Sequence, residues 1–304
     1  MPGDDIDSLL PFSRLLPADL QPVREMLELP DGCRTAVYVY SPAKGAPGRL
    51  PVLYLHGIQS HPGWFCGSAA AMAAAGHAVF QVTRRGSGLG RDGRGHADSA
   101  GQLLEDVAAA GRLALAGTGA ERLHLLGVSW GGKLAAAFAA GHRHGIDVAS
   151  LTLVAPGIAS RADVSFGTKL LVALSLLVRP RRLFDIPLND EKLFTDNEAM
   201  RRYLRDDACR LHRATARFLY VSRCLDGMLR RAGEGALTMP TTLLLAGRDR
   251  IIDNAATSRI VERLTAGRVA IEELDAAHTL EFEPDPPGRG GRSLPWARRR
   301  RRCN

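Results

Sequence analysis

A serine stands between glycines in the stretch Gly127-Val128-Ser129-Trp130-Gly131. An apolar run from Leu123 precedes it, and an alanine-rich segment typical of a helix follows it directly. A strand, a tight turn and a helix in this order can expose a serine hydroxyl as a nucleophile and point free N–H groups at a developing oxyanion. Because Gly-x-Ser-x-Gly arises easily by chance among 32 glycines, a plain glycine-rich turn that caps a helix is the alternative.

The same residues also match the start of a phosphate-binding loop, since Gly127 to Lys133 spell Gly-x-x-x-x-Gly-Lys. Such a loop needs Ser or Thr at the next position to hold magnesium, and this chain has Leu134. A leucine side chain cannot coordinate a hard cation, so the pattern disfavours a nucleotide site. Lys133 is then expected to be a solvated helix residue.

Two later loops supply the partners that a serine nucleophile needs. Asp249 follows an apolar run in Gly-Arg-Asp-Arg, and His278 follows another in Ala-Ala-His-Thr. An imidazole can accept the hydroxyl proton, and a carboxylate can hold the imidazole's tautomer and stabilise its charged form. We therefore predict a catalytic triad of Ser129, Asp249 and His278, in the chain order expected for this kind of turn. Asp253 competes for the acid position, but its place before a helical stretch favours a helix cap.

The oxyanion of such a reaction needs two backbone N–H donors. One is predicted at Trp130, directly after the serine, and the other at Ile58, in the loop after the strand that leads to His56. Gly57 permits a close approach of that backbone. His56 is expected to fix the loop by hydrogen bonding and to take no part in proton transfer.

Composition places the chain among ordinary soluble proteins, with 45% hydrophobic and 24% charged residues over 304 positions. The net charge of +8 comes from the end of the chain, where Gly288 to Asn304 hold seven arginines and no acid. The rest is nearly neutral, so no nucleic-acid partner is expected. The basic tail suggests at most a weak peripheral contact with an anionic membrane.

Five scattered cysteines without metal-ligand spacing predict reduced thiols in a cytoplasmic chain and no metal site. The acidic stretch Met1 to Leu10 lacks the features of a secretory signal. The longest apolar run, Leu170 to Val178, is too short to cross a bilayer.

Short strands and helices alternate along the chain, which predicts an α/β fold with a mainly parallel sheet. Strands are expected at 23–29, 34–40, 50–55, 78–83, 123–128, 148–154, 238–246 and 269–274, and helices at 63–75, 99–116, 130–143 and 255–264. From 158 to 235 the sequence reads as helices with no convincing strand, including one amphipathic stretch over 197–228. The predicted organisation is a core of residues 1–157 and 236–284, a helical cap of 158–235, and a basic, disordered tail of 285–304.

These motifs resemble the α/β-hydrolases, in the branch with monoacylglycerol lipases, lysophospholipases and serine aminopeptidase S33 proteins. The resemblance rests on His56-Gly57-x-x-x-His61, Arg85-Gly86 with Arg94-Gly95-His96, the serine motif, Gly247-x-Asp249 and Ala277-His278, and it covers roughly Leu50 to Glu283. It implies that the cap covers the active site and lines an acyl pocket.

The chain departs from that family in two places. Family members usually carry an Asp before the Arg-Gly pair, where this chain has Thr83 or Arg84. The family also ends with a helix packed on the sheet, whereas proline and arginine dominate after Glu283. Loss of that helix would lower stability near His278.

The functional expectation is a serine hydrolase that cleaves carboxylic esters, including acylglycerol- or lysophospholipid-like ones, without a cofactor. Amide or peptide hydrolysis, thioester hydrolysis and acyl transfer by the same triad remain open, because the cap decides the substrate. A non-catalytic binding protein on this fold is the alternative from another class. The apolar cap residues Leu170 to Leu177 could contact an acyl chain or a lipid surface, or pack within the cap.

Overall fold

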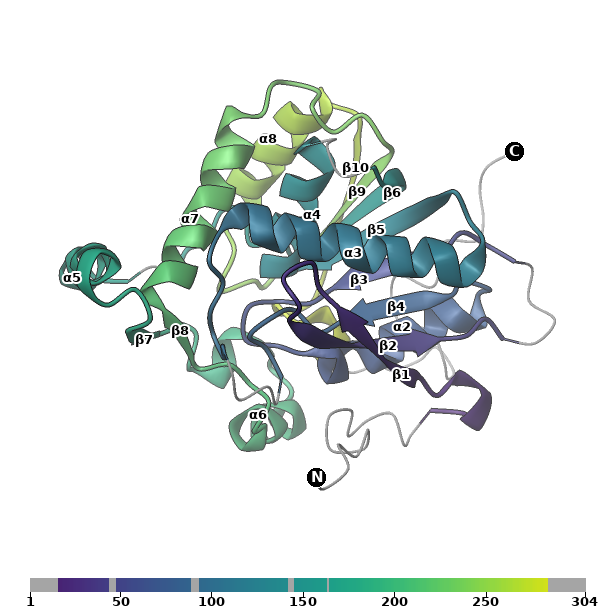
Figure 1. Cartoon of the computed structure of the whole chain (residues 1–304), viewed down its shortest axis with the longest axis horizontal. Coiled ribbons are helices and arrows are strands. Elements are labelled where there is room, and N and C mark those ends of the chain that lie inside the picture. Colours follow the sequence, from purple (N-terminus) through teal and green to yellow (C-terminus); the bar gives the residue numbers. More distant parts are fainter. Residues whose placement is uncertain (1–15, 44–47, 89–92, 142–144, 163, 284–304) are drawn as a thin grey trace.

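The centre of the molecule is an eight-stranded sheet in the order β1-β2-β4-β3-β5-β6-β9-β10 (Figure 1). The computed structural model describes residues 16–43, 48–88, 93–141, 145–162 and 164–283. The strands are β1 (Val23–Glu28), β2 (Arg34–Tyr40), β3 (Val52–Leu55), β4 (Val79–Val82), β5 (Arg122–Val128), β6 (Asp147–Val154), β9 (Thr241–Ala246) and β10 (Val269–Leu274). β2 pairs antiparallel with β1 and β4, and the remaining neighbours are parallel.

Helices connect the parallel strands and cover the sheet. They are α2 (Cys66–Ala74), α3 (Ala100–Thr118), α4 (Trp130–Gly141) and α8 (Asn254–Thr265), with 3-10 turns η2 (Ala18–Leu20), η3 (Pro62–Phe65) and η5 (Leu280–Phe282). α3 and α4 pack on one face, over strand residues such as Leu53, Leu125 and Leu153 that are at most 1% exposed. On this face the central strands are apolar throughout, and β3 is buried on both faces, which is why it is a continuous apolar run in the sequence.

The opposite face of the sheet is only partly covered. α2 packs there through Tyr54, whose hydroxyl lies 3.0 Å from Ser68 Oγ. Beside α2 a groove of about 320 Å³ runs across the strands, lined among others by Leu126, Thr152 and Glu281. The sequence predicts no C-terminal helix to cover this face of the sheet. The predicted tail falls within residues 284–304, which lie outside the described residues.

The segment between β6 and β9 contains α5 (Phe166–Val178), β7 (Leu183–Asp185), η4 (Glu191–Leu193), α6 (Glu198–Asp206), β8 (Arg213–Thr215) and α7 (Ala216–Arg231). The expectation of an all-helical segment was wrong in one respect, because β7 and β8 pair as a small antiparallel sheet. β8 also lies within the amphipathic stretch predicted over 197–228 and separates α6 from α7. Three-residue strands are too short to give a period-two pattern, so the sequence conceals them.

The predicted α/β class and mainly parallel sheet are confirmed. The expectation for Lys133 was wrong. Its side chain is buried, and Nζ lies 2.6 Å from Asp226 Oδ1, so this ion pair joins α4 to α7 under the cap segment. Burial lowers the lysine pKa, against the opposing pull of Asp226.

Candidate active site

Ser129 lies at the sharp turn between β5 and α4. Its φ is 52°, in the left-handed region that non-glycine residues rarely adopt. The backbone is held there from both sides: the Ser129 N–H donates to the Val154 carbonyl (2.9 Å), and the Ser129 carbonyl accepts from the Gly157 N–H (2.6 Å). The surrounding structure therefore maintains the strained conformation that presents the hydroxyl.

Glycines make this turn possible because helix α4 begins in direct contact with the sheet. A Cβ on Gly131 would lie 2.4 Å from the carbonyl oxygens of Leu55 and His56, and one on Gly127 would lie 2.5 Å from the Gly131 carbonyl. Both distances are too short for any side chain. The Gly-x-Ser-x-Gly spacing is therefore required by packing at this turn, and a chance pattern does not explain it.

The structure brings the three predicted triad residues together at the carboxyl edge of the sheet. His278 Nε2 lies 2.9 Å from Ser129 Oγ, and His278 Nδ1 lies 2.8 Å from Asp249 Oδ2. The imidazole and carboxylate are buried, whereas Ser129 is partly exposed. With Nδ1–H donating to the carboxylate, Nε2 is left to accept the serine proton.

The carboxylate of Asp249 is held in its ionised form. Burial by itself raises its pKa, but His278 and the hydrogen bonds to the carboxylate outweigh burial and lower the pKa below its usual value. Its Oδ1 accepts from the N–H groups of Ile251 and Ile252, each at 2.8 Å. Asp253 instead accepts from the Ala256 N–H (2.9 Å) as the cap of α8.

The two residues predicted to form an oxyanion hole flank the serine. A Cβ on Gly57 would lie 3.3 Å from Ser129 Cβ, so the loop that contains Ile58 touches the nucleophile. His56 Nδ1 donates to the Gly57 carbonyl (2.9 Å) and His56 Nε2 accepts from the Arg84 N–H (3.0 Å). Because the carbonyl and N–H of a trans peptide point in opposite directions, the Ile58 N–H is directed away from His56.

Trp130 is the first residue of α4, so its N–H belongs to the turn of amides that have no partner within the helix. Burial lowers the pKa of His56 well below its usual value, and Arg84 adds to this effect. The imidazole therefore stays neutral and holds the loop, in agreement with the role expected for it.

Sequence reasoning missed Arg84, a buried arginine that contacts both residues predicted to form the oxyanion hole. Its guanidinium donates to the carbonyls of Ile58 (2.9 Å) and Arg85 (3.0 Å). It also lies over the rings of Trp130 and Phe218, at 5.1 and 4.8 Å from the ring centroids. Burial lowers its pKa to about 9. The only signal in the sequence was that the chain departs from the family pattern at residues 83 and 84.

A second cluster missed from sequence contains His61, Asp207 and Cys209, whose candidate ligand atoms lie within 4.8 Å of one another. His61 Nε2 already bonds Asp207 Oδ2 (3.0 Å), and Trp64 Nε1 donates to the same oxygen (2.7 Å). Burial and the nearby Asp207 raise the pKa of the Cys209 thiol to about 11, which opposes the thiolate form that binds metals. The cluster therefore reads as a hydrogen-bonded contact between the loop before η3 and the segment after α6.

The fold is shared with solved structures of low sequence identity. A soluble variant of monoglyceride lipase from Saccharomyces cerevisiae, solved with a substrate analogue, is 19% identical, with a TM-score of 0.75 over 87% of this chain and 89% of that chain. Monoacylglycerol lipase from Paleococcus ferrophilus is 20% identical, with a TM-score of 0.70 over 83% and 93%. A thermostable carboxyl esterase from Bacillus coagulans is 13% identical, with a TM-score of 0.70 over 85% and 92%.

No curated protein matches the chain. A family model does: the one described as serine aminopeptidase, S33 matches residues 47–285. This range includes β3, the turn at Ser129, the whole segment between β6 and β9, and the loops of Asp249 and His278. Because the match extends over most of the chain, the protein belongs to the serine aminopeptidase S33 family of hydrolases and has the α/β-hydrolase fold.

Proposed function

We propose that the protein hydrolyses carboxylic esters through an acyl-enzyme formed on Ser129. The observation that carries this proposal is the continuous hydrogen-bonded chain from Ser129 Oγ through His278 to Asp249, with distances of 2.9 and 2.8 Å. Such a chain activates a hydroxyl that is otherwise a weak nucleophile. Its position at a strained turn, flanked by the predicted oxyanion residues Ile58 and Trp130, fits acyl transfer better than a structural role.

In the proposed cycle, Ser129 Oγ attacks the ester carbonyl while His278 Nε2 takes its proton. The Asp249 carboxylate stabilises the imidazolium, and the amides of Ile58 and Trp130 stabilise the oxyanion. His278 then protonates the departing alcohol. Water, deprotonated by the same imidazole, attacks the acyl-enzyme and releases the carboxylic acid with Ser129 restored.

The substrate class proposed is an ester with an apolar acyl chain, of the acylglycerol or lysophospholipid kind. Support comes from the two monoacylglycerol lipases among the structural neighbours. Amide hydrolysis stays the second candidate, because the matched family is described as aminopeptidases. A series of p-nitrophenyl esters of rising chain length, compared with aminoacyl anilides, separates the two classes. Faster turnover of the anilides would overturn the ester proposal.

Ser129→Ala is expected to lower kcat for the preferred ester by about a million-fold, because the nucleophile of a triad cannot be replaced by its neighbours. The variant should keep the thermal unfolding transition of the wild type, since alanine can make the same backbone hydrogen bonds with Val154 and Gly157. Labelling with a fluorophosphonate probe should occur in the wild type and disappear in the variant. Undiminished hydrolysis by the variant would reject the assignment.

A further inference from the structure

Helix α5 presents its apolar side chains to the outside of the molecule. Ser175, a polar residue, is the one buried residue of this helix, at 2% exposure. The exposed fractions of the large apolar residues are 83% for Phe166, 54% for Leu170, 52% for Leu174, 83% for Leu177 and 77% for Val178. Their spacing of four, four, three and one places them on one face. The helix is therefore inverted relative to one that packs on a core.

The position of α5 leaves this face uncovered by the described residues. The helix packs against α7 and projects from the side of the molecule away from the sheet (Figure 1). Of the two sequence-based alternatives for these residues, packing within the cap does not account for the outward side chains. Removing large apolar side chains from water is favourable in proportion to the area buried, so this exposed face favours association with an apolar partner.

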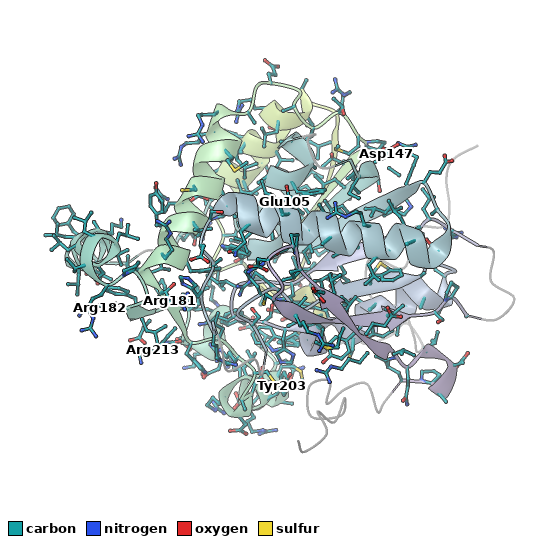
Figure 2. The ribbon with its side chains drawn as sticks, in the orientation of Figure 1. Glu105, Asp147, Arg181, Arg182, Tyr203 and Arg213 are labelled. Atoms are coloured by element: carbon teal, nitrogen blue, oxygen red, sulfur yellow. The ribbon has the colours of Figure 1, made fainter. Side chains whose placement is uncertain are left out.

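Positive charge surrounds the same face. From Ser165 to Phe184 the sequence contains four basic residues and no acid. Lys169, Arg179, Arg181 and Arg182 are all exposed. Arg213, on the neighbouring strand β8, is exposed as well, and its Nε lies 3.5 Å from Asp185 Oδ1. Figure 2 shows Arg181, Arg182 and Arg213 on the same side of the molecule as α5. Apolar side chains ringed by arginine and lysine are the composition of a helix that binds an anionic lipid surface.

Self-association accounts less well for this composition. A symmetric contact through α5 would bring the arginines of two copies toward one interface. Residues 165–184 offer no carboxylate to pair with them, and Asp185, which follows, already lies 3.5 Å from Arg213. An anionic bilayer fits both the apolar face and the positive charge beside it. The leucines can be buried among the acyl chains, and the guanidinium groups can bind the anionic headgroups.

We propose that α5 docks the protein on anionic phospholipid bilayers, with the helix lying in the plane of the headgroups. Thirteen residues of helix extend about 20 Å, which is shorter than the roughly 30 Å hydrocarbon core. Among the described residues, no helix has the length and apolar character to span a bilayer. The docking surface consists of Phe166, Leu170, Leu174, Leu177 and Val178 with the basic residues around them. The sequence had suggested membrane contact through the basic tail, which stays a separate prediction.

The test is co-sedimentation of the full chain with vesicles of phosphatidylcholine alone or mixed with phosphatidylglycerol. The wild type is expected to bind the mixed vesicles and to bind pure phosphatidylcholine at least tenfold more weakly, since arginines are attracted to an anionic lipid surface. Leu174→Gln/Leu177→Gln should weaken binding to mixed vesicles about tenfold or more. Arg181→Gln/Arg182→Gln should remove most of the preference for phosphatidylglycerol.

A matched control replaces apolar residues that are equally exposed but far from α5. Val23→Gln/Met26→Gln changes residues of β1 that are 62% and 44% exposed, and vesicle binding is expected to stay unchanged. Binding by the Leu174→Gln/Leu177→Gln variant equal to that of the wild type would overturn the proposal. So would a wild-type dimer in analytical ultracentrifugation that the same variant converts to monomer, together with no vesicle binding.

Hydrolysis of a soluble short-chain ester separates this inference from the proposed function. The α5 variants should hydrolyse p-nitrophenyl acetate at the wild-type rate, because the substituted side chains point away from the molecule. If no variant and no wild-type sample hydrolyses any ester, the esterase proposal fails while the vesicle result still stands. If the wild type hydrolyses esters normally but does not bind the mixed vesicles, only the docking proposal fails.

Discussion

At the scale of single residues, the burial of Arg84 beside the predicted active site needs an explanation. Burial of an arginine that no carboxylate contacts among the described residues is costly. Two carbonyls, two aromatic rings and the charge of the more distant Asp106 offset part of that cost. One of these carbonyls belongs to Ile58 and one of these rings to Trp130, the two proposed oxyanion donors. The contacts indicate that Arg84 positions these donors relative to each other.

Arg84→Gln should lower kcat for the preferred ester about tenfold or more and leave KM nearly unchanged, because the donors act on the transition state more than on bound substrate. Arg84→Lys should recover part of the loss, since one ammonium can still reach a carbonyl. Steady-state kinetics of both variants measure the effect. A fall in melting temperature with unchanged kcat in both would show a merely structural side chain.

At the scale of elements, the turn from β5 into α4 depends on backbone contact more than on side chains. The Cβ positions at Gly127 and Gly131 are filled by backbone atoms, whereas a Cβ on Gly141, at the end of the same helix, meets nothing within 4 Å. The helix therefore supplies its own control for the effect of adding a methyl group.

Gly131→Ala is expected to lower the free energy of unfolding by about 3 kcal/mol, because α4 must move away from β3 to admit the methyl group. Gly141→Ala should be neutral or stabilising by up to about 1 kcal/mol, since alanine is the better helix former. Urea unfolding compares the two. Equal effects would contradict the close contact described at the turn.

The short turn η5 ties the His278 loop to α2 through Glu281, whose carboxylate accepts from the Ser68 N–H at 2.8 Å. Burial raises the pKa of Glu281 from 4.5 to about 7, against the opposing effect of that hydrogen bond. Between these values the folded protein holds a proton that the unfolded chain has lost. The free energy of unfolding should therefore fall as the pH rises from about 4.5 to about 7, and stay low above it.

Glu281→Gln removes this titration. It is expected to unfold like the wild type near pH 5 and to be about 2 kcal/mol more stable than the wild type near pH 8, because the buried group no longer has to ionise. Urea unfolding at the two pH values gives the comparison. Parallel profiles for the two proteins would show that Glu281 does not carry the pH dependence.

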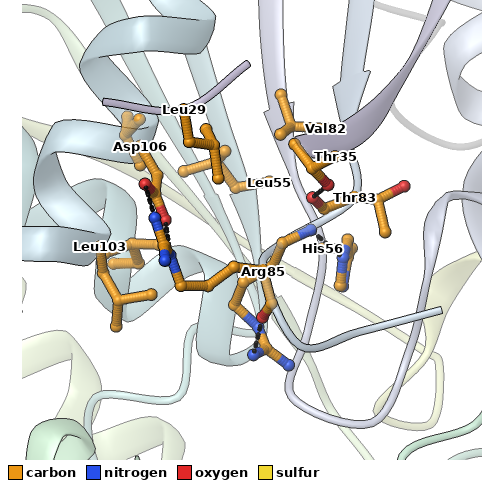
Figure 3. Close-up of a pocket in the computed structure, with 12 residues that line it drawn as sticks. Leu29, Thr35, Leu55, His56, Val82, Thr83, Arg85, Leu103 and Asp106 are labelled. Carbon is orange, nitrogen blue, oxygen red and sulfur yellow. Dashed lines mark hydrogen bonds and ion pairs between the residues drawn. The ribbon is translucent and has the colours of Figure 1, made fainter. Parts of the chain in front are cut away.

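At the scale of the whole molecule, one buried arginine joins three segments that are distant in the chain. Arg85 donates to both oxygens of Asp106 on α3, at 2.5 and 2.6 Å (Figure 3). It also donates to both oxygens of Asp31, in the turn between β1 and β2, at 2.7 and 3.2 Å. The contact with Arg85 lowers the pKa of Asp31 to about 2. This network fastens the antiparallel edge of the sheet to the helix that covers it.

Arg85→Lys should lower the free energy of unfolding by about 2 kcal/mol, because a single ammonium cannot satisfy two carboxylates, one of them largely buried. Arg122→Lys serves as the control, since the Arg122–Asp147 pair is more than half exposed at both side chains and should contribute little. Thermal or urea unfolding measures both. A similar small effect at the two positions would refute the role given to Arg85.

Local sequence determined the chemistry and most of the elements. The Gly-x-Ser-x-Gly turn, the loops of Asp249 and His278, and the alternation of strands and helices follow from the type and order of neighbouring residues. Parallel strands place their carboxyl ends at one edge of a sheet, so three distant residues could be assigned to one site before any coordinates. Short-range rules suffice there because each motif is set by its own backbone geometry.

Only the tertiary structure decided which side chains face which partners. Periodicity marks α5 as a helix, but nothing in its sequence tells that Ser175 turns inward and the leucines outward. Likewise the sequence predicts Lys133 to be solvated, whereas the structure buries it in an ion pair with Asp226 of α7. Arg84 is buried against Phe218 of the same helix, which the sequence does not indicate. Burial depends on contacts between segments far apart in the chain, and those contacts are not encoded at any single stretch of sequence.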